Sequence, residues 1–235
     1  MIMERNKPEA AAKAERLSFF AGKKQVLKNI SFEVNKGEFM AVLGPNGAGK
    51  TSLIKAFLGF NRPASGRVFV EGTEVSPKTA GEIRRRTAYL PQSFDVDRNF
   101  PILVKDVVSM GCGYVNDAVV KELNIRALLE RPFGLISGGE RQKAMLAMVL
   151  SRNPSVLFFD EPNLNLDPFS YRNFLKVVSS VYAKHGLTVI FVTHLVTNMP
   201  EACKRVLVLK EGEVIRDGEK EKVMSGKNFM EAVYG

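Results

Sequence analysis

The residues best suited to chemistry form one short glycine-rich run: Gly44, Pro45, Asn46, Gly47, Ala48, Gly49, Lys50 and Thr51. This run fits the pattern G-x-x-x-x-G-K-[ST], and it stands between an apolar strand-like stretch, 39–43, and a helical pattern. Glycines let the backbone curl until successive N–H groups point at phosphate oxygens, and a helix N-terminus adds partial positive charge. The pattern therefore predicts that the run, extended to Ser52, binds nucleoside triphosphate phosphates, with Lys50 on the β- and γ-phosphates and Thr51 on Mg²⁺. The alternative is a chance glycine-rich turn.

A pair of carboxylates, Asp160 and Glu161, follows the apolar stretch 156–159. A buried strand delivers such residues to its carboxyl end, which is where open α/β sheets bind ligands. We therefore expect Asp160 to lie beside the phosphate-binding run and to hold Mg²⁺. Glu161 is the next residue and points in another direction, so it is expected to polarise an attacking water. The alternative is a strand that ends in two solvated acidic residues.

Strand and helix patterns must position these residues. Apolar strand-like stretches alternate with helical patterns in the second half of the chain, which predicts parallel βαβ units. The first part carries hairpin signals, notably over 66–75, and the middle, 104–131, is helical in pattern. Residues 1–14 are polar and rich in alanine, and we expect them to form a flexible leader. Together these patterns predict an α/β fold.

Composition limits the class of protein more than it identifies a function. Apolar residues make up 45% of the 235 residues and charged residues 25%, which is typical of globular proteins. No apolar run reaches the ~18 residues of a membrane-spanning helix, and no signal peptide is visible. The two cysteines, Cys112 and Cys203, predict neither a disulfide framework nor a metal cluster, and so indicate a reducing compartment. The net charge of +9 is scattered along the chain, and we expect no nucleic-acid partner.

A third motif, 136–140, reads Ile-Ser-Gly-Gly-Glu and precedes a helical pattern. In its order and spacing between the phosphate-binding run and the two carboxylates, it resembles the LSGGQ signature of the ATP-binding cassette (ABC) family. The resemblance covers 15–235 and implies an α/β P-loop ATPase domain with a mostly parallel core sheet, an antiparallel β-subdomain and a helical insert near 95–145. It further implies a head-to-tail homodimer that closes on two ATP molecules. In such a dimer each ATP is also contacted by the second subunit, through its copies of Ser137, Gly138 and Gly139.

Other residues match the family one by one. Gln92 resembles the glutamine of the family's glutamine loop, which couples Mg²⁺ and water to the membrane partner. Asp167 resembles the aspartate of its D-loop, and His194 resembles the switch histidine that contacts the γ-phosphate. The resemblance thus implies an ATPase that uses ATP and Mg²⁺. Its implied catalytic residues are Glu161, His194 and Gln92, and its implied Mg²⁺ ligands are Thr51, Gln92 and Asp160.

One departure from the family concerns the base of the nucleotide. Family members usually carry an aromatic residue that stacks on adenine, and the ungapped alignment places Ala21 at that position. The neighbouring Phe20 faces the other way, because side chains alternate along a strand. A one-residue slip would bring Phe20 to the base, but it would also flip the rest of the strand. We favour the ungapped alignment, which predicts weak discrimination between ATP and GTP.

A single cassette without membrane-spanning helices implies a separate transmembrane permease, and thus the ATPase subunit of an importer. The segment 95–111 is similar to the manganese/zinc and iron-chelate importer branch, which implies transport of a metal ion or metal chelate and, indirectly, a substrate-binding protein. The implied location is cytoplasmic, peripheral on the inner face of the cell membrane. The stretch 92–112 is expected to line a groove for a short permease helix, unless its apolar residues belong to the core of the insert. The alternative function is a soluble ABC ATPase without transport, of the iron–sulfur assembly or nucleic-acid-associated type.

Overall fold

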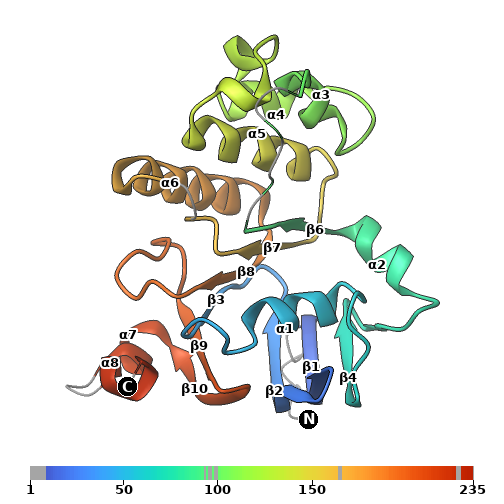
Figure 1. The fold of residues 1–235 in the computed structure, drawn as a ribbon, viewed down its shortest axis with the longest axis vertical. Coiled ribbons are helices and arrows are strands. Elements are labelled where there is room, and N and C mark those ends of the chain that lie inside the picture. The colour runs from blue at the N-terminus through green and yellow to red at the C-terminus, as the bar shows by residue number, and fades with distance from the viewer. Residues whose placement is uncertain are drawn as a thin grey trace, which may run out of the picture.

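The structure is a computed structural model that describes residues 9–92, 94, 97, 100–163, 166–225 and 229–234. A larger sheet crosses the middle of the molecule, a smaller sheet lies below it, and a group of helices lies above it (Figure 1). None of the helices formed by the described residues is long and apolar enough to cross a membrane.

The larger sheet has six strands: β3 (Phe39–Leu43), β6 (Thr87–Leu90), β7 (Val156–Asp160), β8 (Thr188–Thr193), β9 (Arg205–Lys210) and β10 (Glu213–Glu219). Their order is β10-β9-β3-β8-β7-β6, and all neighbours are parallel except β9 and β10, which form an antiparallel hairpin. β3, β7 and β8 are buried along their whole length, as continuous apolar runs predict for a parallel sheet. Because Asp160 pairs with Val192, and Leu43 with Thr193, the carboxyl ends of these strands meet at one edge.

The smaller sheet is antiparallel and is made of β1 (Ala10–Ala21), β2 (Lys24–Asn35), β4 (Ser65–Val70) and β5 (Thr73–Glu74). β1 lies between β2 and β4, and it begins inside the stretch expected to be a leader. That expectation is wrong for residues 10–14. Ala12 pairs with Val34 on one side and with Val70 on the other, and it is fully buried. Alanine gives little strand signal by itself, and here β1 is a strand because two neighbours pair with it, while Ala12 packs in one of the two hydrophobic cores.

Helices cover both faces of the larger sheet: α1 (Lys50–Phe57), α2 (Ala80–Arg86), α3 (Val104–Ser109), α4 (Asp117–Glu122), α5 (Gly138–Leu150), α6 (Pro168–His185), α7 (Lys220–Met224) and α8 (Phe229–Tyr234). Two 3₁₀ turns, η1 (Arg126–Leu128) and η2 (Phe133–Leu135), lie between α4 and α5. Figure 1 shows α3, α4 and α5 grouped above the sheet with α6 beneath them, and this group is the helical insert that the family resemblance implied. α6 ends at Gly186, whose φ of 60° is the left-handed conformation that glycine adopts at the end of a helix.

Two hydrophobic cores lie on opposite faces of the larger sheet, and β7 contributes to both. Phe158 packs against Phe57 of α1, with ring centroids 5.9 Å apart, on the side of the smaller sheet. The next residue, Phe159, packs against Phe174 of α6 at 6.2 Å, on the side of the helical insert. Because side chains alternate along β7, this one buried strand contributes to the cores on both faces of the sheet. The same alternation determines the face toward which the Asp160 side chain points.

Candidate active site

The phosphate-binding run follows β3 directly and leads into α1. Its glycines are needed for space as well as for conformation. Gly49 has a φ of 103°, and a Cβ atom there would lie 2.8 Å from the carbonyl oxygen of Val26. A Cβ atom on Gly44 would lie 2.1 Å from the carbonyl oxygen of Leu209. The run therefore curls tightly between β2 and β9, with the first turn of α1 at its end, as a loop that binds phosphate requires.

Lys50 is buried, and its ammonium group has three oxygen partners. Lys50 Nζ donates to the carbonyl oxygens of Gly44 at 2.9 Å and Pro45 at 2.8 Å. The same atom forms an ion pair with Glu161 Oε1 at 2.9 Å. In this state the lysine predicted to bind the γ-phosphate is held by its own loop and by the predicted general base.

Asp160 lies at the carboxyl end of β7 and joins that strand to the phosphate-binding run. Thr51 Oγ1 donates to Asp160 Oδ1 at 3.0 Å, and the Tyr89 hydroxyl donates to Asp160 Oδ2 at 3.0 Å. Burial raises the pKa of the Asp160 carboxyl above its ordinary value, although the hydrogen bonds from Tyr89 and Thr51 oppose this shift. Burial and the nearby Asp160 carboxylate likewise raise the pKa of Tyr89, so this phenol stays a donor. No sequence motif predicts a role for Tyr89. The one indication in the sequence is the position of Tyr89 near the end of the strand that precedes Gln92.

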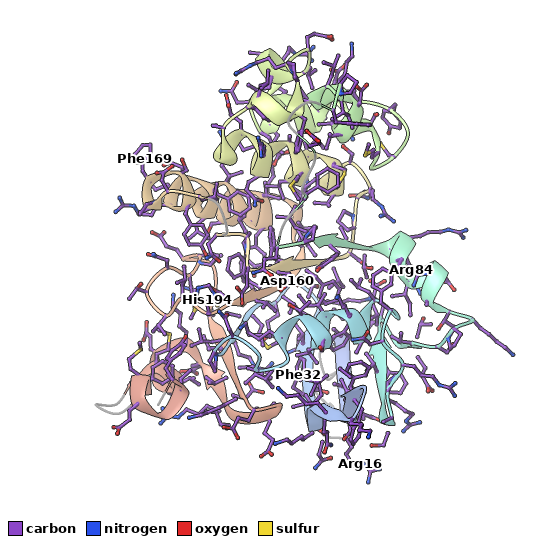
Figure 2. All side chains as sticks on the ribbon, viewed as in Figure 1. Arg16, Phe32, Arg84, Asp160, Phe169 and His194 are labelled. Atoms are coloured by element: carbon purple, nitrogen blue, oxygen red, sulfur yellow. The ribbon has the colours of Figure 1, made fainter. Side chains whose placement is uncertain are left out.

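Glu161 is where several predicted residues meet. Its φ of 46° is unusual for a residue other than glycine, and such strain of about 1–3 kcal/mol is found at functional sites. This conformation turns the side chain toward the phosphate-binding run while its N–H donates to the Val192 carbonyl at 3.0 Å. Glu161 Oε2 pairs with His194 Nδ1 at 2.9 Å and accepts from Gln92 Nε2 at 3.4 Å. Figure 2 shows Asp160 and His194 in the same central region of the molecule, at the level of the larger sheet.

These side chains border an open pocket of about 410 Å³. Its lining residues are Lys24, Val26, Asn46, Gly47, Gly49, Lys50, Thr51, Ser52, Gln92 and Glu161. Most of them belong to the predicted set, but Lys24 and Val26 of β2 do not. Ala21 pairs with Lys24 at the end of the β1–β2 hairpin, and neither Ala21 nor Phe20 is among the residues that line the pocket.

Four predicted residues, Ser137, Gly138, Gly139 and Asp167, lie away from this pocket, at the starts of α5 and α6. Ser137 is the N-cap of α5, and Gly138 and Gly139 are its first two residues. Ser137 Oγ accepts from the N–H of Glu140 at 3.3 Å, while the Ser137 N–H donates to Glu140 Oε2 at 2.8 Å. Asp167 is the N-cap of α6 and accepts from the N–H groups of Phe169 and Ser170, both at 3.0 Å. One copy of the chain thus does not bring the 136–140 motif to its own phosphate pocket.

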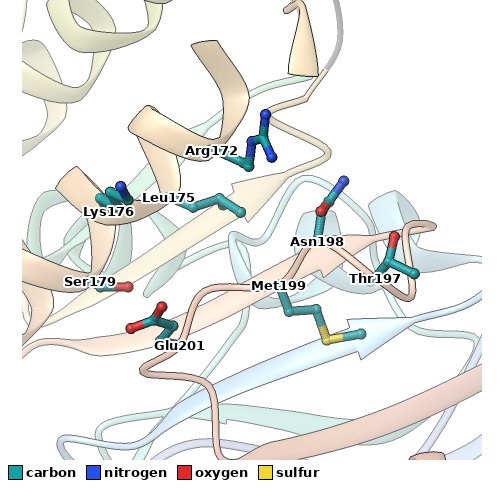
Figure 3. A pocket seen from close by; sticks show the side chains of 8 residues that line it. All are labelled: Arg172, Leu175, Lys176, Ser179, Thr197, Asn198, Met199 and Glu201. Atoms are coloured by element: carbon teal, nitrogen blue, oxygen red, sulfur yellow. The ribbon is translucent and has the colours of Figure 1, made fainter. Parts of the chain in front are cut away.

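A second pocket, of about 290 Å³, lies between α6 and the loop after β8 (Figure 3). Its lining residues are Arg172, Leu175, Lys176, Ser179, Thr197, Asn198, Met199 and Glu201. It contains none of the predicted site residues. Within the described ranges, no three His, Cys, Asp or Glu side chains are grouped so that they could hold a metal ion by themselves.

Comparisons with known proteins agree with this geometry. A family model described as ABC transporter matches residues 27–164. The hemin import ATP-binding protein HmuV of Rhodopseudomonas palustris is 33% identical over 230 residues, which cover 91% of this chain and 87% of that protein. The energy-coupling factor transporter ATP-binding protein EcfA1 of Methanospirillum hungatei is 30% identical over 228 residues, covering 91% and 80%. Among solved structures, cbiO1 from Clostridium perfringens, part of the ABC transporter complex cbiONQ, has a TM-score of 0.83 at 29% identity and covers 96% of this chain and 94% of that one. The chain therefore belongs to the ABC transporter family, and it is an ATP-binding ATPase domain of that family.

Proposed function

We propose that this chain hydrolyses ATP with Mg²⁺ and thereby energises a separate transmembrane permease of an importer. One observation carries the proposal: the Glu161 carboxylate contacts Lys50 through one oxygen and His194 through the other, at 2.9 Å each, beside the phosphate-binding run. A carboxylate, a lysine and a histidine at these distances can orient a water molecule and neutralise the charge that develops on a transferred phosphoryl group.

The residues around Asp160 fit Mg²⁺. Carboxylate and hydroxyl oxygens are the ligands that Mg²⁺ prefers, and Asp160 Oδ1 and Thr51 Oγ1 lie 3.0 Å apart. We propose that these two residues and Gln92 hold the ion, which when bound neutralises charge on the β- and γ-phosphates. Burial disfavours the charged form of Asp160 and raises its pKa, so a bound cation would stabilise this carboxylate.

Four residues of the site have proposed roles in the reaction. Lys50 leaves the carbonyl oxygens of its own loop and binds the γ-phosphate. Glu161 accepts a hydrogen bond from the attacking water and takes its proton as the new oxygen–phosphorus bond forms and the bond between the γ-phosphorus and the ADP oxygen breaks, with ADP as the leaving group. His194 keeps the Glu161 carboxylate in place through Nδ1 and approaches the γ-phosphate. Gln92 transmits structural changes at this site to the permease, since it follows β6 at the point where the chain continues toward the helical insert.

We further propose that the working unit is a homodimer. The α5 N-terminus, with Ser137 and the two glycines after it, is an anion-binding element that one subunit does not use on its own ATP. A head-to-tail dimer places this element on the ATP of the second subunit. Light scattering on the Glu161→Gln protein is expected to show a monomer without nucleotide and a dimer with ATP–Mg²⁺. A monomer under both conditions would count against this assembly.

The permease surface is proposed to lie near α2 and the first helix of the insert. A pocket of about 230 Å³ is lined there by Phe60, Arg84, Met110 and neighbouring residues, and Phe60 and Met110 are both more than half exposed, at 59% and 57%. This differs in part from the groove expected over 92–112. Ile102 and Val104 are buried in the core of the insert, so they are not available to a partner. Phe100 is 56% exposed, and residues 93, 95, 96, 98 and 99 lie outside the described part of the chain. Cysteine cross-linking to the permease from positions 60 and 110, compared with 102, tests this surface.

A metal ion or metal chelate is the proposed cargo, carried by the permease and delivered by a substrate-binding protein. Support comes from the similarity of segment 95–111 to metal-importer ATPases and from the relative named for hemin import. The proposed location follows from the partner: the cytoplasmic side of the membrane, bound to the permease. Co-purification with an integral membrane protein tests this proposal, and a chain that associates with none would favour the alternative of a non-transport ATPase.

The base of the nucleotide is proposed to be recognised weakly. No aromatic residue is found among the described residues that line the pocket, to which the β1–β2 hairpin contributes Lys24 and Val26 of β2. Stacking of a base on an aromatic ring is worth roughly 1–3 kcal/mol. We expect Ala21→Tyr to bind ATP more tightly and to prefer it over GTP. If Phe20→Ala instead loses affinity while Ala21→Tyr gains none, Phe20 is the stacking residue.

The central experiment is the Glu161→Gln variant. We expect it to bind ATP and to hydrolyse it at least ~100-fold more slowly, the lower range for loss of a general base. Glu122→Gln is the matched control, because Glu122 is another paired carboxylate, bonded to Lys184 and His185 on a different part of the surface. Normal turnover in the control and near-normal turnover in Glu161→Gln would reject the assignment.

A further inference from the structure

The short helix α8 is firmly attached near the catalytic end of β8. Two of its residues, Phe229 and Val233, are buried in the core shared with the helical insert. The Arg216 guanidinium of β10 lies 5.5 Å from the centre of the Phe229 ring, which adds a cation–π contact. These contacts hold the helix in one place, so its last described residue, Tyr234, has a defined position.

The Tyr234 side chain reaches the residue that is proposed to hold Glu161. Its hydroxyl donates to the main-chain carbonyl oxygen of His194. Burial raises the pKa of the Tyr234 phenol, and the negative charge of Glu161 adds to this effect, so the phenol stays protonated. Tyr234 is therefore a hydrogen-bond donor over the whole physiological pH range.

The loop after β8 needs such a contact. Regular sheet pairing of β8 ends at Thr193, and His194 follows immediately. Two hydrogen bonds restrain the residues beyond it: the Leu195 N–H donates to Thr193 Oγ1 at 3.0 Å, and the Tyr171 hydroxyl donates to the Asn198 carbonyl at 3.2 Å. Tyr234 restrains the His194 peptide group directly through its hydrogen bond to the carbonyl oxygen. The orientation of this peptide group sets the direction from which the imidazole ring approaches Glu161 Oε2.

We propose that Tyr234 is a positioning residue for the ATPase reaction: it fixes the His194 peptide so that Nδ1 keeps its 2.9 Å contact with Glu161. This inference rests on the proposed function, because it gives His194 and Glu161 their roles. The helix α8 thereby couples the C-terminal part of the chain to the phosphate pocket, through one hydroxyl group.

The test is Tyr234→Phe in the full chain, which removes the hydroxyl and keeps the ring. Tyr182→Phe is the matched control, since the Tyr182 hydroxyl also donates to a main-chain carbonyl, that of Gly37, at 2.7 Å. We expect Tyr234→Phe to lower kcat about three- to tenfold, the kinetic equivalent of one neutral hydrogen bond, with KM for ATP unchanged. In a His194→Ala background the same substitution should lower turnover no further. A wild-type kcat, an effect on KM alone, or an equal loss in both backgrounds would overturn the proposal.

A spectroscopic measurement separates this inference from the proposed function. The chain has two histidines, His185 and His194, so the ¹⁵N signals of their imidazole rings can be assigned with His194→Ala. In the nucleotide-free protein, Tyr234→Phe should move the His194 signals and leave those of His185 in place, whereas Tyr182→Phe should move neither set. Unmoved His194 signals overturn the inference even if ATP hydrolysis is confirmed. Moved signals in a chain that does not hydrolyse ATP would show that the positioning holds and the proposed function fails.

Discussion

Removing the charge of Glu161 should have opposite effects on the stability of the empty protein and on its affinity for ATP. Lys50 and Glu161 form a buried ion pair, with side chains only 4% and 9% exposed. Removing one partner of such a pair typically costs about 3–5 kcal/mol. In Glu161→Gln the Lys50 ammonium group keeps its hydrogen bonds to the Gly44 and Pro45 carbonyl oxygens, and the glutamine side chain can still donate or accept hydrogen bonds. We therefore expect a smaller loss of unfolding free energy, about 1–3 kcal/mol.

Bound ATP should cancel this loss, because phosphate oxygens replace the carboxylate as partners of Lys50. Wild-type protein must give up the Lys50–Glu161 contact when the nucleotide binds, and the variant has no such contact to give up. A difference of about 1–3 kcal/mol then makes ATP binding roughly 5- to 150-fold tighter in Glu161→Gln. The variant designed to stop hydrolysis is thus expected to be the better ATP binder.

Thermal unfolding with and without ATP–Mg²⁺ measures both effects. For a chain of this size about 1 kcal/mol corresponds to about 2–4 °C in Tm, so the empty variant should melt about 2–12 °C below wild type. Saturating ATP–Mg²⁺ should raise the Tm of the variant more than that of wild type. The Glu122→Gln control should show its own small loss equally with and without nucleotide. If the empty Glu161→Gln protein is as stable as wild type, or if ATP raises both Tm values equally, the reasoning from the ion pair is wrong.

Three further predictions concern stability. Asp160→Asn should stabilise the nucleotide-free protein at neutral pH while abolishing hydrolysis; because the folded-state pKa of Asp160 is raised, the wild type gains stability as the pH falls, and the difference in Tm should shrink toward acid pH. Gly111→Ala should destabilise the insert by about 1–3 kcal/mol in a denaturant titration, since its Cβ atom would lie 1.9 Å from the Met148 carbonyl oxygen, whereas Gly81→Ala, with open space around its Cβ position, should not destabilise. Burial raises the pKa of Glu122, but the hydrogen bonds from its two basic partners outweigh burial and lower this pKa overall. The stability that Glu122→Gln removes should therefore be present at pH 7 and disappear as acid protonates the carboxyl. An unchanged difference in stability at low pH would contradict this.

The sequence predicted which residues gather at the site better than how they contact one another. Strand ends and the glycine pattern were enough to place Lys50, Thr51, Asp160 and Glu161 at one edge of a parallel sheet. The contact between Lys50 and Glu161 depends on the positive φ of Glu161, and no local pattern indicates such a conformation for glutamate. Tyr89 was missed for a similar reason, because its role depends on which strand lies beside β7.

Errors in the fold have equally physical causes. The alanine-rich start of β1 has no hydrophobic alternation, and it is a strand because two neighbours pair with it. Apolar residues at 102 and 104 could face either a partner or a core, and only the packing of the insert decides between these. The short helices α2, α7 and α8 were not predicted, since segments of five to seven residues gain their stability from tertiary contacts and not from their own sequence.

The alternation of Phe158 and Phe159 also bears on how the molecule unfolds. Both cores depend on β7, so losing either core removes half of the burial that holds this strand. Neither half can therefore open fully and leave the other intact, although the two cores lie on opposite faces of the sheet. The chain should unfold in one cooperative transition, with coincident curves from different probes. Amide protons of β7 and its neighbour β8 should exchange only through that global transition, while those of the exposed turns should exchange through local opening.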